Sequence, residues 1–299
     1  MSGNGGEPKF DLWHYKPNLA ANALLGCLFL ICLIGHLWRM VRTRSWLFVP
    51  FNIGCAMEVI GYFGRIWARS NDDALGPYIM QTLMLLVAPA FFAASIYMIL
   101  GRLIRLVDAE HLSLIRTTRL TKVFVGADIL CFVVQGGGGG LMASNDPDKR
   151  NLGKWVVLAG LFIQIFAFGL FIVVSVLFNV RINRKPTETS LDESLPWKIH
   201  LQVLYFTSAL IMIRSIFRVV EFAQGHDGYI MRTEWMILII DGALMVLVVM
   251  VTVLWHAGEV FMRERGRDAY DMPLNSRHSG TDGELPGDYP HQGVRRGRK

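Results

Sequence analysis

The sequence predicts an all-α, polytopic membrane protein in which seven hydrophobic helices form one bundle. Three observations predict this fold: 53% of the residues are hydrophobic, only 18% are charged, and the hydrophobic residues gather in long blocks. A block of about 20 apolar residues, rising about 1.5 Å per helical residue, matches a hydrocarbon layer about 30 Å thick. Little sequence is left over for a separate soluble domain.

The seven blocks follow one another with short polar connections. We expect membrane helices over residues 19–38, 47–67, 78–100, 123–142, 155–180, 199–222 and 235–255. Residues 1–18 are then an extracellular N-terminal segment, residues 19–258 the membrane domain, and residues 259–299 a disordered cytosolic tail rich in Gly, Pro, Asp and Arg. Tryptophans stand near the block ends, as in an interfacial aromatic belt: Trp38, Trp46, Trp67, Trp155, Trp197, Trp235 and Trp255.

The basic residues predict the orientation. Fifteen Lys and Arg fall in the first, third and fifth loops and just after the seventh block, against seven on the other side. Cytosolic loops carry the excess of basic residues, so the N-terminus is expected outside and the C-terminus in the cytosol. The net charge of +6 therefore reflects membrane orientation and does not indicate nucleic-acid binding. All four cysteines lie inside the blocks, which leaves no extracellular disulfide framework.

Ionisable and polar residues inside the blocks mark a candidate substrate-binding and translocation site. A charged group near the bilayer centre costs roughly 2.5–3.5 kcal/mol on insertion scales, so such residues are functional candidates. Glu58, Tyr62 and Arg65 stand at i, i+4 and i+7, which is one face of one helix. The same spacing recurs in Arg214, Arg218 and Glu221. The remaining candidates are Gln81, Tyr97, Asp128, Gln135, Glu234 and Asp241.

Most of these candidates fall in the half of the membrane predicted to be extracellular. Glu58 lies near the middle and Asp128 on the cytosolic side of it. We expect the polar stripes to converge on a cavity that opens outward and suits an amphiphile with a charged or zwitterionic head group. The alternative interpretation is structural, because Arg–carboxylate pairs can fix helix register and residues near helix ends can reach water.

Two other function classes remain open. The topology also fits a seven-helix receptor or lipid sensor that binds without transporting, although no cysteine near the outer end of the third block could form the disulfide usual in such receptors. His36, His200 and His256 lie at predicted cytosolic helix ends, where a zinc-dependent hydrolase would need them to meet. The glycine run 136–140 lacks the Lys–Ser/Thr of a phosphate loop. We expect no catalytic residues, no metal and no cofactor.

Several of these residues stand in segments that resemble a known family. The segments are Glu58-Val-Ile-Gly-Tyr62-Phe-Gly-Arg65, Gln81…Ala88-Pro89-Ala-Phe91…Tyr97, Asp128…Gln135-Gly-Gly-Gly, Phe217-Arg218…Glu221 and Glu234…Asp241. Together they resemble the fungal lipid-translocating exporters, a seven-helix group of RTA-like aminocholesterol-resistance proteins. The resemblance covers residues 13–258.

The resemblance implies export or flipping of amphiphilic lipids such as sphingoid long-chain bases, with sterol-like and porphyrin ligands as further classes. It also implies a place among the membrane lipids of the plasma membrane, or of the vacuole or another endomembrane. The family commonly ends its seventh helix with His-Pro-Gly, whereas this chain has His256-Ala257-Gly258. Because proline stops helices, its loss predicts that the helix continues toward Arg265.

Overall fold

The computed structural model describes residues 18–70, 75–142, 144, 146–192, 195–224 and 234–262, without the side chains of residues 70, 75–79, 118, 234 and 237. Within these ranges all regular structure is helical, and seven helical segments are long and apolar enough to cross a membrane. The prediction of an all-α protein with seven membrane-spanning helices is therefore confirmed. The predicted N-terminal segment and tail lie outside the described residues, apart from residue 18 and residues 259–262.

Six of the spans are single helices and the seventh is composite. The six are α1 (Leu19–Thr43), α2 (Val49–Ser70), α3 (Leu75–Leu106), α4 (Thr117–Met142), α5 (Pro147–Arg184) and α7 (Trp197–Gln224). The seventh joins α9 (Glu234–Ile237), the π-helical segment η3 (Leu238–Ala243) and α10 (Leu244–Leu254). Short helices in the connections are η1 (Trp46–Phe48), η2 (Glu110–Leu112) and α6 (Glu188–Leu191).

Polar residues cap helix starts, and at α5 the cap lies well before the hydrophobic block. The Asn18 side chain accepts the N–H groups of Ala20 and Ala21 at the start of α1. At the start of α5, Asp146 accepts the N–H of Asp148 and Pro147 occupies the first turn. With 38 residues, α5 is roughly 57 Å long at 1.5 Å per residue and exceeds the thickness of a bilayer.

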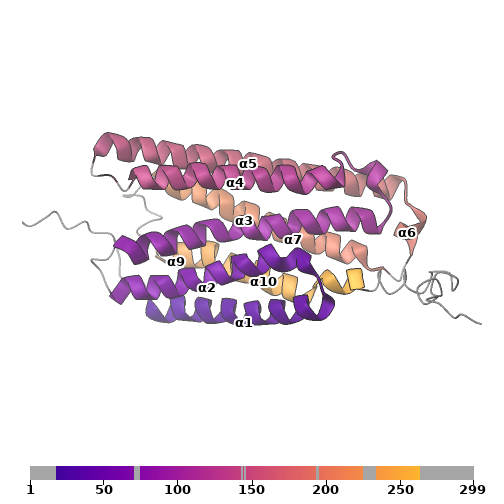
Figure 1. Ribbon diagram of the computed structural model, residues 1–299, viewed down its shortest axis with the longest axis horizontal. Helices are drawn as coiled ribbons and strands as arrows, with labels where there is room; N and C mark the ends of the chain where they lie inside the picture. Colours follow the sequence, from indigo (N-terminus) through magenta and orange to yellow (C-terminus); the bar gives the residue numbers. More distant parts are fainter. Residues whose placement is uncertain are drawn as a thin grey trace, which may run out of the picture. The chain divides into compact units, whose positions relative to one another are not determined.

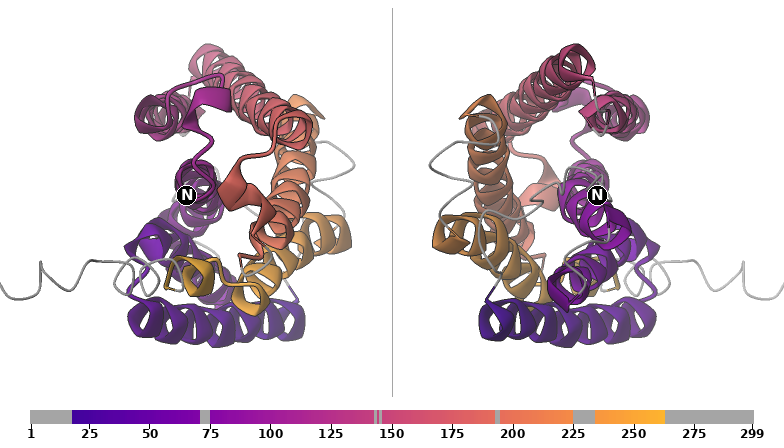
Figure 2. Two further views of the ribbon diagram at one scale, coloured as in Figure 1. Left: turned by 90° about the vertical axis from the view of Figure 1, so that its right-hand side faces the viewer. Right: turned by 90° about the vertical axis from the view of Figure 1, so that its left-hand side faces the viewer.

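The seven spans close into a ring. Contacts run from α1 to α2, α3, α4, α5, α7 and α10 in turn and back to α1, and α3 also contacts α7 across the ring (Figures 1 and 2). Glycines on α2 allow α3 to approach closely, since a Cβ at Gly61 would lie 2.7 Å from Leu85 Cγ. This contact brings the polar stripe of α2 and the first half of α3 to the same end of the bundle.

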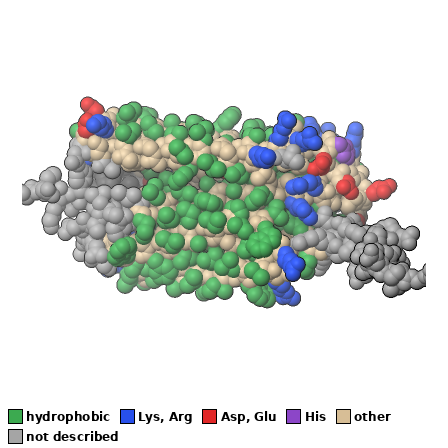
Figure 3. Space-filling model, viewed as in Figure 1, with side chains coloured by type: hydrophobic (Ala, Val, Ile, Leu, Met, Phe, Trp, Pro, Cys, Tyr) green, Lys and Arg blue, Asp and Glu red, His purple; other side chains and the backbone are tan. Residues whose placement is uncertain are grey.

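The outer surface of the bundle is apolar between two polar ends (Figure 3). One of them, called the basic end below, carries Arg39, Arg42, Arg44, Arg102, Arg105, Arg116, Arg119, Lys122, Arg181, Arg184, Lys185 and Lys198. Six of the predicted belt tryptophans are exposed. Trp197 is the exception: it is buried, and its indole N–H donates to the Ser190 carbonyl at 3.1 Å. The prediction that Trp197 faces the membrane interface is therefore wrong.

The seventh span does not continue as expected from the missing proline. Helix α10 ends at Leu254, and a new helical turn occupies residues 258–262. The His256 side chain accepts the backbone N–H of Gly258 through Nδ1 at 3.1 Å. A side-chain acceptor at this place starts the new turn in the way that a helix N-cap does, so the helix breaks without proline.

Candidate functional site

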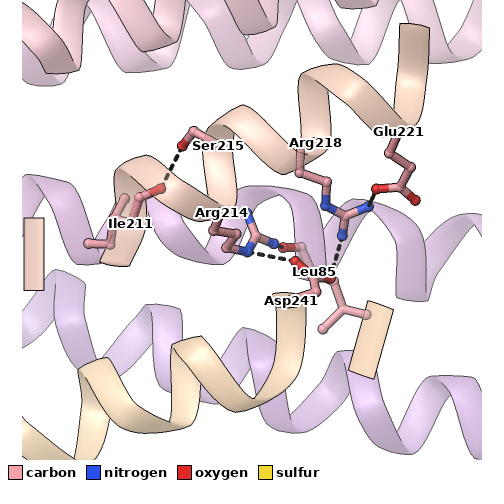
Figure 4. A network of polar contacts seen from close by, with 7 residues as sticks. All are labelled: Leu85, Ile211, Arg214, Ser215, Arg218, Glu221 and Asp241. Atoms are coloured by element: carbon pink, nitrogen blue, oxygen red, sulfur yellow. Dashed lines mark hydrogen bonds and ion pairs between the residues drawn. The ribbon is translucent and has the colours of Figure 1, made fainter. Parts of the chain in front are cut away.

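Four buried charged side chains meet at the end of the bundle opposite the basic end; we call Arg214, Arg218, Glu221 and Asp241 the ionic cluster (Figure 4). Asp241 Oδ1 lies 2.7 Å from Arg214 Nε, and its Oδ2 lies 2.6 Å from Arg218 Nη2. Arg218 Nη1 donates to Glu221 Oε2 at 3.1 Å. The i+3 and i+4 spacing places all three α7 residues on one face, and η3 presents Asp241 to that face.

A proline in α3 supplies a further partner for the cluster. Pro89 lies inside α3 and has no N–H, so it cannot bond to the carbonyl four residues earlier, which is that of Leu85. Arg214 Nη2 donates to this Leu85 carbonyl (Figure 4). In a membrane span a freed carbonyl needs such a partner, because no lipid group can replace the lost bond. Arg214 therefore connects α3, α7 and η3.

The π-helical segment η3 brings Asp241 into the cluster and packs closely on α2. A Cβ at Gly242 would lie 2.6 Å from the Tyr62 hydroxyl oxygen, so a larger residue there would displace the tyrosine. The Tyr62 ring stacks on Phe29 of α1, with 5.6 Å between the ring centroids. Single π turns inside α-helices occur frequently at functional sites.

The polar residues Glu58, Tyr62 and Arg65 of α2, called the α2 stripe, lie beside the ionic cluster. The charged groups that act on the Tyr62 hydroxyl are Glu58, Asp241, Arg65 and Arg214. Gln81 of α3 faces α2, where a Cβ at Gly64 would lie 3.5 Å from Gln81 Cβ.

Eight predicted residues thus gather at this end: Glu58, Tyr62, Arg65, Gln81, Arg214, Arg218, Glu221 and Asp241. All eight are buried, with at most 7% of each residue exposed. The polar stripes therefore pack against one another in this conformation, and the outward-open cavity expected from the sequence stays a prediction.

The other predicted site residues lie elsewhere. The Tyr97 hydroxyl donates to Asp128 Oδ2 at 3.0 Å, between α3 and α4, and the Tyr97 ring packs edge-on against Phe171 of α5. Gln135 donates to Gln164 Oε1 at 2.9 Å, between α4 and α5. These two pairs bridge neighbouring helices and make no described contact with the ionic cluster. Glu234 begins α9, and its side chain lies outside the described part.

Histidines gather at the basic end; we call His36, His200 and His256 the histidine cluster. The rings of His36 and His256 lie 5.8 Å apart between centroids, and His200 is close enough to act on His256 electrostatically. His36 Nε2 lies 3.2 Å from both the Val249 carbonyl and the Thr252 hydroxyl. Among the described residues, no group of three His, Cys, Asp or Glu side chains has an arrangement that could hold a metal ion.

The hydrogen bonds assign the protons of two of these rings. The Thr252 hydroxyl donates to backbone carbonyls of its own helix, so it accepts from His36, whose Nε2 therefore carries the proton. His256 accepts at Nδ1 and so carries its proton on Nε2. The histidine cluster is thus held by neutral hydrogen bonds, whereas the ionic cluster is held by opposite charges.

Two contacts at or beside the ionic cluster were not expected from the sequence. The Leu85 carbonyl had a signal, since a proline at position 89 of a predicted helix frees the carbonyl at position 85. The close approach of Gly242 to Tyr62 had none, because it depends on the π turn that η3 inserts.

Comparisons with known proteins identify the family of this chain. The model of the RTA1-like protein family matches residues 51–264. Protoporphyrin uptake protein 1 of Saccharomyces cerevisiae is 42% identical over 68% of this chain and 66% of its own length. Protein RTA1 of the same yeast is 37% identical over 81% of this chain and 83% of its own length. The sphingoid long-chain base transporter RSB1 of Saccharomyces cerevisiae is 28% identical over 88% of this chain and 76% of its own length.

No solved structure matches the chain. The family model nevertheless spans well over half of the sequence and includes both the ionic cluster and the α2 stripe. The chain is an integral membrane protein that belongs to the RTA1-like family.

Proposed function

We propose that this protein moves amphiphilic lipids or lipid-like molecules across the membrane and binds their polar head groups at the ionic cluster. The observation that carries the proposal is a compensated set of two arginines and two carboxylates, buried inside a bundle whose outer surface is apolar. Such a pairing of polar interior and lipid-facing surface suits a molecule with a charged head and an apolar tail.

The cluster favours exchange of one ion pair for another. Bringing an isolated charge into a hydrocarbon layer is costly, and a charge that replaces an existing partner avoids most of that cost. Arg218 bonds to both Glu221 and Asp241, so a head group can take one of these places while the other bond remains. Two relatives carry names that specify amphiphiles with ionisable groups, a sphingoid base and a porphyrin.

The proposed route of the head group runs along the polar face of α2 that carries Glu58, Tyr62 and Arg65. In this proposal Arg214, Arg218 and Glu221 hold the head group, while Glu58, Tyr62, Arg65 and Asp241 line its path. The basic end faces the cytosol and the N-terminus lies outside, as the distribution of Lys and Arg favours. The plasma membrane is the proposed location.

Translocation of a labelled sphingoid base across liposomes that hold the purified full-length protein, without ATP, tests the proposal. We expect transport by the wild type and loss of transport in Arg218→Ala and Glu221→Ala when rates are compared per amount of folded protein in the liposomes. Lys149→Ala is the matched control, because Lys149 lies in the exposed first turn of α5, where it pairs with Asp146 at 3.8 Å. Unchanged transport in both cluster variants would contradict the site.

The same liposomes separate the alternatives. Specific binding of the lipid without transport would instead favour a seven-helix lipid sensor. With neither binding nor transport of the sphingoid base, porphyrins and sterol amines are the next substrates to assay, and failure with all three would refute the proposal.

A further inference from the structure

One buried carboxyl group beside the ionic cluster makes no ion pair with the described residues. Glu58 lies in the α2 span and is 1% exposed. Its Oε1 has no hydrogen-bond partner, and among the described residues no cation lies within ion-pair distance of the carboxylate. An isolated carboxylate in a low-dielectric interior costs several kcal/mol, so this group needs either a cation or a proton.

The neighbouring cations are already engaged. Arg214 bonds to Asp241 and the Leu85 carbonyl, and Arg218 bonds to Asp241 and Glu221. The two arginines and the two carboxylates of the ionic cluster cancel in charge. An ionised Glu58 would therefore add one negative charge to the ionic cluster, whose own charges cancel, and the third buried cation of this end, Arg65, is not among the charged groups that act on the Glu58 carboxyl.

Charged and titratable groups from two further elements surround Glu58. Arg214 and Arg218 approach from α7 and Asp241 from η3, and these three are the charged groups that act on its carboxyl. Within α2 itself, Cys55 and Tyr62 lie on the neighbouring turns. Arg214 thus forms an ion pair with Asp241 and acts on Glu58 only electrostatically, without an ion pair between them.

From this arrangement we propose that Glu58 binds and releases one proton in each transport cycle, so that movement of the amphiphile is coupled to proton movement. This inference rests on the proposed function. With the proton bound, Glu58 is neutral, and Arg214 remains on Asp241 and on Leu85. With the proton released to water, the Glu58 carboxylate competes for Arg214.

Competition for Arg214 gives the proton a structural effect. Arg214 is the side chain that joins α3, α7 and η3, so its partial transfer to α2 loosens the contacts that close the ionic cluster. A metal cation is a poorer occupant than a proton, because it requires several oxygen ligands, and no suitable group of three acidic, His or Cys side chains exists among the described residues.

Proteoliposomes with an internal pH-sensitive dye and a clamped membrane potential test the inference. For one proton per substrate molecule, a gradient of one pH unit supports about a tenfold accumulation ratio of the labelled sphingoid base. Addition of substrate should also move protons in the wild type. Glu58→Gln keeps the shape of the side chain and should lose both the proton movement and the response to the gradient.

Glu259→Gln is the matched control, since Glu259 is half-exposed at the basic end and pairs with Arg39 at 3.4 Å. This variant should keep the wild-type response. Wild-type transport without proton movement would overturn the inference and leave the proposed function standing. Proton movement retained in Glu58→Gln would overturn the assignment to Glu58.

A spectroscopic measurement keeps the inference testable even where no lipid is transported. In infrared difference spectra recorded as the pH changes, the wild type should show the C=O band of a protonated carboxyl group that Glu58→Gln lacks. Identical spectra for the two proteins would refute proton binding at Glu58, whereas absence of transport alone would count only against the proposed function.

Discussion

The ionic cluster and the histidine cluster are buried toward opposite ends of the bundle, and they are built differently. The ionic cluster joins opposite charges, and Asp241 of η3 holds two arginines of α7. The histidine cluster joins neutral rings to a hydroxyl and to backbone groups, as His36 shows with Thr252 and the Val249 carbonyl. Ion pairs therefore hold α7 and η3 together at one end. At the other end, a neutral hydrogen bond from the Gly258 N–H to the His256 ring lies where α10 stops.

The largest expected effect comes from removing the central acid of the ionic cluster. Asp241→Asn leaves Arg214 without an acid partner and Arg218 with Glu221 alone. Breaking a buried ion pair on one side typically costs about 3–5 kcal/mol. We expect a large fall in the thermal stability of the detergent-solubilised protein, followed by size-exclusion chromatography, together with loss of transport. Wild-type stability would show that charge does not tie these helices.

A smaller effect is expected from keeping the charge and changing its geometry. Arg218→Lys retains one positive charge but replaces the planar fork that reaches Glu221 and Asp241 at once. Loss of one charge-assisted hydrogen bond corresponds to about 1.5–3 kcal/mol. Transport rates should fall more than protein levels do, and full activity would mean that charge alone suffices.

At the histidine cluster we expect a milder and purely structural effect. His256→Ala removes the acceptor of the Gly258 N–H and should cost about 1 kcal/mol, as loss of a helix cap does. His256→Asn offers another short acceptor and should recover most of the loss. Thermal stability is the readout, and a larger loss of transport than of stability would show that the basic end also acts in translocation.

The smallest effect is expected at the rim of the histidine cluster. Arg39 and Glu259 form a half-exposed pair at 3.4 Å, with 27% of the Arg39 side chain and 54% of the Glu259 side chain accessible. Exposed pairs contribute about 1 kcal/mol or less. Arg39→Gln should therefore leave the melting temperature nearly unchanged, and a large shift would indicate that this pair closes the basic end.

The number of spans and much of the site could be predicted from the sequence. The thickness of the lipid bilayer fixes the length of each span, and the position of a polar residue within a span gives its depth in the membrane. The i, i+4 and i+7 spacing placed Glu58, Tyr62 and Arg65 on one face, and the depth of Arg214 and Asp241 placed them at the same level. Depth alone could not separate these residues from those of α4, because it does not give the rotation of a helix about its own axis.

Rotation explains which predicted residues lie apart from the cluster. Asp128 and Gln135 are seven residues apart on α4, and that face turns toward the neighbouring helices, where Tyr97 of α3 and Gln164 of α5 satisfy them. Packing of Gly160 against the Gln135 side chain, where a Cβ would lie 2.8 Å from Gln135 Cγ, fixes this rotation. A single sequence contains no record of that pairwise fit.

The π turn in η3 has a mechanical consequence. It holds one residue more than an α-helical turn between two segments that are otherwise α-helical. Each residue of an α-helix turns the chain by about 100°, so the extra residue rotates α9 relative to α10 about the axis of the span. The direction in which Asp241 faces α7 is therefore set by one inserted residue, and a one-residue deletion within η3 would turn that side chain away from both arginines.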